Sequence, residues 1–270
     1  MLRRIFLIVL AGAAAWARAR DAASAGTGLT AEQIRGASVS EKFSIPSPGE
    51  LLAAFGKTGK PDWSAMVRKS PAGTFTSRPQ IALNLGALIA DGCLAVEAQD
   101  KQEVKNISRE IKNLAKGLGL EHDLVSRSNS IADFADNRQW NALSEEFEAV
   151  QNELAAAMEG RQDHAFVTLM ALGGWLRTVE IISGHLTTNY TPEGARALRQ
   201  PAVVGYFIQQ LGMMPAKISA SPMITGLRRE LPKIHTAVSF PAGHLPSAED
   251  VARLKGITTG IMDAIGIQEK

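Results

Sequence analysis

The chain has 270 residues, of which 45% are hydrophobic and 21% are charged. This composition excludes a largely disordered protein and supplies enough apolar surface for one large helical domain or two small ones. The formal net charge of +2 is too small to indicate a nucleic-acid partner.

The N-terminus has the three parts of a secretory signal peptide. Arg3 and Arg4 precede an apolar run over residues 5–16, and two overlapping A-x-A cleavage patterns follow it. The run is short for a bilayer span, so we expect cleavage after residue 19 rather than an uncleaved membrane anchor. Cleavage there removes three arginines and leaves 26 Lys and Arg against 27 Asp and Glu. We therefore expect an exported, periplasmic or secreted protein without a stable membrane span.

The next residues are predicted to lead from a tether into a folded domain. Residues 20–46 are rich in Ala, Ser and Gly, which favours a flexible tether, and residues 47–270 are predicted to form a single all-helical domain. Its first helix begins at the capping box Ser-Pro-Gly-Glu of residues 47–50. Residues 57–79 then predict a long irregular segment that Trp63, Met66 and Phe75 hold against the core.

Two stretches are predicted to form buried central helices, because their apolar residues spread around nearly the whole circumference. They cover residues 80–99 and 164–186. In the second, Gly173 and Gly174 have no side chain, so a neighbouring helix can come close there. In the first, Asn84 and Asp91 share a face with small residues, which also predicts a closely packed neighbour.

The remaining predicted helices are amphipathic and are expected to surround the central pair. They cover residues 101–118, 126–136, 137–160, 191–211 with a bend at Pro201, 221–238 with a kink or break at Pro232, and 247–265. The 137–160 helix has the most regular pattern, with Trp140, Leu143, Phe147, Val150, Leu154 and Met158 on one side.

No segment alternates apolar and polar residues over the length of a strand. The fold class predicted is all-α, a multi-helix bundle of about eight helices with two central buried helices and antiparallel neighbours along the chain. Residues 83–86 and 170–173 form similar Leu-Gly-ending tetrads at similar places in the two central helices. This similarity is the basis of a hypothesis of two related halves, although four residues match easily by chance.

Motifs for common catalytic chemistry are missing from the sequence. The five histidines lack metal-ligand spacing, Gly56-Lys57-Thr58 lacks the earlier glycine of a phosphate loop, and there is no G-x-S-x-G. Cys93 is the only cysteine, so it cannot form an internal disulfide, and its apolar helix predicts a buried, unreactive thiol. The sequence thus indicates no catalytic residues, no metal site and no cofactor.

Charged residues on the two apolar helices are the candidates for a site. Asp91, Arg177 and Glu180 each need a partner or a cavity, because an unpaired charge in a core is costly. Arg177 and Glu180 can pair because they are three positions apart, and Arg177 is the preferred partner of Asp91. Such a cluster either locks the helices in register or forms a ligand site with Trp63 or Trp175 as a wall.

Two functions follow from these patterns. The first is a non-enzymatic interaction or scaffold protein of the cell envelope, with another envelope protein as its partner. The alternative is a soluble binding protein that holds a small ligand, for example an anion, between the central helices near Asp91, Arg177, Glu180, Trp175 and Trp63. An enzyme of unrecognised type is a third alternative, and nucleic acid is not expected as a partner.

Overall fold

The structure is a computed structural model that describes residues 45–59, 61–68, 75–241 and 243–266. The predicted signal peptide at residues 1–19, and all but the last two residues of the predicted tether at 20–46, lie outside these ranges. Every regular element in the described ranges is a helix, which confirms the all-α prediction. Nine of the described α-helices have nine residues or more and two are shorter, against about eight predicted.

The described chain contains α-helices and two short 3-10 turns. The α-helices are α3 (Pro48–Gly56), α4 (Arg78–Glu97), α5 (Lys101–Gly117), α6 (Val125–Asp136), α7 (Trp140–Gly160), α8 (His164–Thr188), α9 (Pro192–Arg196), α10 (Pro201–Gly212), α11 (Ala216–Ser219), α12 (Pro222–Val238) and α13 (Ala248–Gly266). The 3-10 turns are η2 (Ser64–Met66) and η3 (Glu121–Leu124).

Local capping signals account for several helix starts. At α3 the amide of Glu50 donates to Ser47 Oγ, and the amide of Ser47 donates to Glu50 Oε2, which completes the predicted capping box. Asp100 caps α5 and Ser221 caps α12 in a related way, each accepting from backbone amides of the first turn.

Two expectations about proline need correction or refinement. The predicted single helix over residues 191–211 is wrong, because the chain forms α9 and α10 with a break between them. Pro201 stands at the first position of α10, where its missing N–H costs no hydrogen bond and its fixed φ suits a helix start. Pro232 does not break α12, which runs through it from Pro222 to Val238.

The two central helices, α4 and α8, run parallel. Near their N-terminal ends Arg78 Nη2 lies 2.8 Å from Asp163 Oδ2, and its guanidinium lies 4.4 Å above the Phe166 ring. Thirteen residues after Arg78, Asp91 pairs with Arg177. Because a residue further along α4 contacts a residue further along α8, the two helices run in the same direction.

Backbone contact joins α4 and α8 at their crossing. A Cβ added to Gly86 would lie 1.8 Å from the Met170 carbonyl oxygen, and one added to Gly173 would lie 2.0 Å from the Leu83 carbonyl oxygen. The two tetrads singled out in the sequence therefore face each other, the glycine of each against the first residue of the other. Only glycine permits this approach, as predicted for Gly173.

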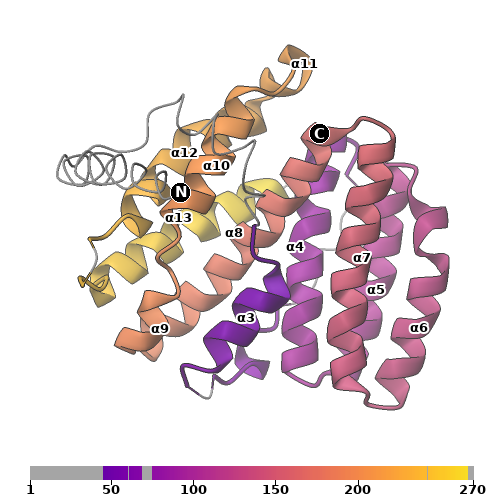
Figure 1. The fold of residues 1–270 in the computed structure, drawn as a ribbon, viewed down its shortest axis with the longest axis horizontal. Helices are drawn as coiled ribbons and strands as arrows, with labels where there is room; N and C mark the ends of the chain where they lie inside the picture. Colours follow the sequence, from indigo (N-terminus) through magenta and orange to yellow (C-terminus); the bar gives the residue numbers. More distant parts are fainter. Residues whose placement is uncertain (1–44, 60, 69–74, 242, 267–270) are drawn as a thin grey trace, which may run out of the picture. The chain divides into compact units, whose positions relative to one another are not determined.

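Helices α5, α7 and α13 pack around the central pair in the opposite direction. Gly117 at the end of α5 lies against Ile81 near the start of α4, and Gln80 Nε2 donates to the carbonyl of Ile265 near the end of α13. In the part of the chain from Ile45 onward, Figure 1 shows α4 to α7 side by side and α8 crossing from them toward α10, α12 and α13.

Two described helices, α4 and α8, are long and apolar enough to cross a membrane by length and composition. Most of each is buried inside the protein, as expected for core helices. Their length and composition are therefore weak support for a membrane span.

Candidate functional site

The predicted charged residues form one ion cluster between α4 and α8. Arg177 Nε donates to Asp91 Oδ1 over 2.7 Å, and Arg177 Nη1 donates to Glu180 Oε2 over 2.9 Å. Asp91 is 4% exposed and Arg177 is 5% exposed. The preferred pairing of Asp91 with Arg177, and of Arg177 with Glu180, is confirmed.

A second arginine completes the cluster and was not predicted. Arg68 donates from Nε and Nη2 to Asp91 Oδ2 over 3.0 and 2.9 Å. It comes from the irregular segment that follows η2, where no periodic pattern indicates which side chains face the core. The two carboxylates and two guanidinium groups balance in charge, so the cluster needs no further counterion.

The protonation of Arg177 is secured by its partners. Burial alone lowers the pKa of a guanidinium, but the charges of Asp91 and Glu180 and their hydrogen bonds outweigh it, so the pKa of Arg177 is raised. One group is left over: Arg177 Nη2 is buried and has no hydrogen-bond partner among the described residues. An unsatisfied donor in a core is costly.

The two predicted tryptophan walls contact other parts of the protein. Trp175 Nε1 donates to Gln200 Oε1 over 2.7 Å, and the Trp175 ring packs against Phe207 of α10. Trp175 and Arg177 are two positions apart on α8, so their side chains leave the helix in nearly opposite directions. Trp63 makes an edge contact with the Phe55 ring and lies against Gly56.

Cys93, two positions after Asp91 on α4, is buried as predicted. Burial, reinforced by the negative charges of Glu97 and Glu148, raises the pKa of its thiol to about 12. Burial also raises the pKa of the half-buried Glu97. A thiol with such a pKa is almost wholly protonated at neutral pH, which agrees with the predicted unreactive role.

The described part of the chain has no cluster of three or more His, Cys, Asp or Glu side chains that could hold a metal. His185 instead makes an edge contact with the Phe55 ring, with centroids 5.6 Å apart. Burial lowers the pKa of His185, against an opposing effect of Asp62.

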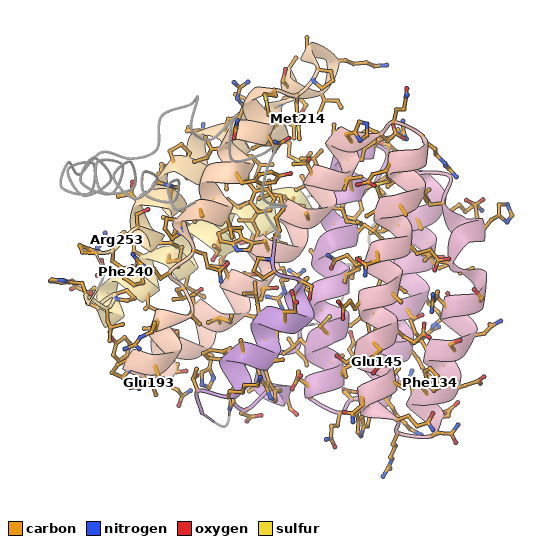
Figure 2. The ribbon with its side chains drawn as sticks, in the orientation of Figure 1. Phe134, Glu145, Glu193, Met214, Phe240 and Arg253 are labelled. Atoms are coloured by element: carbon orange, nitrogen blue, oxygen red, sulfur yellow. The ribbon has the colours of Figure 1, made fainter. Side chains whose placement is uncertain are left out.

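Two surface hollows lie along the α12 and α13 pair, and the sequence indicated neither. One, of about 540 Å³, is lined by polar and apolar residues that include Phe240, His244 and Arg253; Figure 2 labels Phe240 and Arg253 at this end of the pair. The other, also about 540 Å³, lies further along and is lined mainly by glycine and aliphatic residues. Neither of these two hollows includes Asp91 or Arg177 in its lining.

In comparisons of the chain with models of protein families, with characterised proteins and with solved structures, no match was found.

Proposed function

We propose that this chain is an exported helical protein that acts through protein contacts in the cell envelope rather than through catalysis. Export is supported by the basic, apolar and A-x-A segments of residues 1–19. A non-catalytic role is supported by the ion cluster: Arg177 and Arg68 balance the charges of Asp91 and Glu180, so these groups act as a lock between helices.

An exposed apolar side chain is the position at which we expect a partner protein to make contact. Met213, at the end of α10, is 61% exposed, whereas the next residue, Met214, is buried. Figure 2 labels Met214 at the end of α10, next to α11. Flexible methionine side chains suit contact with partner proteins, because they adapt to irregular apolar surfaces.

The export half of the proposal is tested by mass spectrometry of the protein purified from its native host. We expect a mature N-terminus between Arg18 and Gly26. An intact Met1 on a membrane-bound form would contradict export as a cleaved, freely released protein.

The contact half is tested by photo-crosslinking in native envelopes. A photoreactive residue at position 213 should give a discrete crosslinked product, and the same residue at exposed position 145 on α7 serves as the matched control. Equal crosslinking from both positions, or none from position 213, would contradict a contact surface at Met213.

A second candidate function rests on the unpartnered Arg177 Nη2. We propose as the alternative that a carbonyl, carboxylate or phosphate oxygen of a small ligand takes up this donor, which would make the protein a binding protein at its central helices. Acetate, succinate and inorganic phosphate should then raise the unfolding midpoint of the wild type by mass action, but not that of Arg177→Met. Equal shifts in both proteins, or none, would contradict this alternative.

A further inference from the structure

The second hollow is a groove between α12 and α13 that is bordered by small residues. Gly226 of α12 and Gly256 and Gly260 of α13 line it, with Ala264 continuing the same face of α13. Residues four apart on a helix lie above one another, so Gly256, Gly260 and Ala264 form one continuous strip. This strip is exposed, and the bottom of the groove is aliphatic: Leu227, Ile261 and Ile265 are buried, and Ile257 is partly buried.

These glycines are not required by packing within the chain. A Cβ added to Gly226, Gly256 or Gly260 would meet no atom within 4 Å, whereas one added to Gly86 or Gly173 would collide with backbone. Glycine inside a helix lowers helix stability relative to alanine. The space beside these three glycines is therefore open, and a larger side chain there would occupy it.

The size of the groove suits a small ligand. About 540 Å³ lies within the range of roughly 300–1,000 Å³ typical of small-molecule sites. One turn of an α-helix with side chains is a cylinder about 10 Å wide and about 5.4 Å long, or roughly 420 Å³. The groove therefore has room for an extended acyl chain or for one face of a partner helix.

Polar groups lie at both ends of the groove, and the charged ones that could hold the head group of an amphiphile lie at one of them. At one end the Gln80 amide donates to the Ile265 carbonyl. Near the other end Arg229 Nε donates to Glu230 Oε1, and Lys233 Nζ lies 2.8 Å from Glu230 Oε2. Two cations against one carboxylate leave a net positive charge there, and the Arg229 side chain is 74% exposed, so it can also bind an anion.

The wider charge distribution also favours an anionic ligand. Between Glu193 and Glu230 the chain has no acidic residue but five basic ones: Arg196, Arg199, Lys217, Arg228 and Arg229. This stretch includes α10, α11 and the half of α12 that lines the groove. This local excess of positive charge favours an anion on the α12 side of the groove.

We propose that the groove binds the acyl chain of an anionic amphiphile, with the chain along the Gly256, Gly260 and Ala264 strip and the carboxylate or phosphate head group at Arg229. A free fatty acid and a membrane phospholipid share this chemistry. The inference is independent of the contact surface at Met213.

Titration of the full chain with hexadecanoate, followed by calorimetry, tests the proposal. We expect saturable binding of one molecule per chain. Gly260→Leu, which fills the groove, should weaken binding by about tenfold or more. Gly184→Leu is the matched control: it is also a helical glycine with nothing within 4 Å of an added Cβ, but it lies on α8 outside the groove, so its binding should match the wild type.

The role of the head group is tested by Arg229→Gln. This variant should bind hexadecanoate severalfold more weakly and lose any preference for it over hexadecanol. Sedimentation with vesicles then distinguishes a membrane phospholipid from a free fatty acid. Binding to phosphatidylcholine vesicles that contain phosphatidylglycerol, lost in Gly260→Leu, identifies a membrane lipid, and binding of hexadecanoate without vesicle binding identifies a free fatty acid.

Three results would overturn the proposal. They are no saturable binding of hexadecanoate or vesicles by the wild type, equal binding by Gly260→Leu and the wild type, and self-association of the chain that Gly260→Leu abolishes while no lipid binds. The last would assign the groove to a helix interface between copies.

Discussion

Arg177 of α8 and Asp91 of α4 are joined by a hydrogen-bonded ion pair of 2.7 Å inside the protein. Because α4 and α8 run parallel and touch at Gly86 and Gly173, this pair fixes how far one helix can slide along the other. A buried ion pair adds little stability over an apolar pair of the same shape, but breaking one is costly, because the remaining charge is left buried.

The ion pair predicts strong coupling in a double-mutant cycle. Asp91→Asn or Arg177→Met alone should lower the free energy of unfolding by about 3–5 kcal/mol, and the double variant should lose less than the sum, with a coupling above about 1 kcal/mol. Urea unfolding measures each value. Additive losses, or a single Arg177→Met variant as stable as the wild type, would contradict the ion pair.

Arg68 provides the internal comparison for that cycle. Its side chain is 31% exposed, so water can solvate Asp91 partly when Arg68 is replaced. Arg68→Met should therefore cost less than Arg177→Met, on the order of 1 kcal/mol. A larger loss from Arg68→Met than from Arg177→Met would show that the irregular segment, and not α8, neutralises Asp91.

The sequence predicted the Asp91 and Arg177 pair for a physical reason. Each is a charge on an otherwise apolar helix, and glycines near Arg177 permitted close approach, so few partners were open to either. Arg68 gave no such signal, because its segment has no period and any of its charges could have faced water. The leftover Nη2 of Arg177 depends on the orientation of one guanidinium group, which residue spacing cannot indicate.

For the fold, too, a regular pattern of residues allowed a prediction and irregular features did not. The period of apolar residues predicted most helices, including the buried side of α7 with Leu143, Phe147 and Leu154. The relative direction of the helices was harder to predict. Helices that follow one another are antiparallel because their links are short, but α4 and α8 are separated by three helices and run parallel. The α12 and α13 groove arises where two helices distant from α4 in sequence pack with glycines facing outward, and spacing alone does not distinguish such glycines from those of a tight contact.

The helix crossing predicts opposite effects for two glycine substitutions. Gly86→Ala would place a Cβ 1.8 Å from the Met170 carbonyl oxygen, so α4 and α8 must separate, at a cost of at least about 3 kcal/mol. Gly184→Ala, also within a central helix, meets nothing within 4 Å and should stabilise the protein by up to about 1 kcal/mol. Thermal and urea unfolding of both variants test the pair, and a neutral Gly86→Ala would refute the backbone contact.

His185 predicts how stability changes with pH. Burial lowers the pKa of His185 in the folded state, so between that value and the ordinary value of about 6.5 the unfolded chain binds more protons. The free energy of unfolding should therefore rise with pH across this window and fall as the pH drops through it. His185→Phe keeps an aromatic ring beside Phe55 but cannot titrate, so this part of the slope should disappear in urea unfolding measured between about pH 5 and pH 7.5. An unchanged slope would mean that other groups carry it.

Because Cys93 is buried, we expect the rate of thiol labelling to measure how often the core opens. With its pKa raised to about 12 by burial and by Glu97 and Glu148, the thiolate fraction at pH 8 is roughly a thousandfold lower than for an ordinary cysteine. Labelling of the folded protein should thus be slower than in urea by at least that factor, and should proceed through opening of α4. Asp91→Asn, which destabilises the centre, should speed labelling in proportion to the lost free energy of unfolding when reclosing is faster than labelling. Fast labelling of the wild type, unaffected by Asp91→Asn, would show that the thiol is accessible in the folded state.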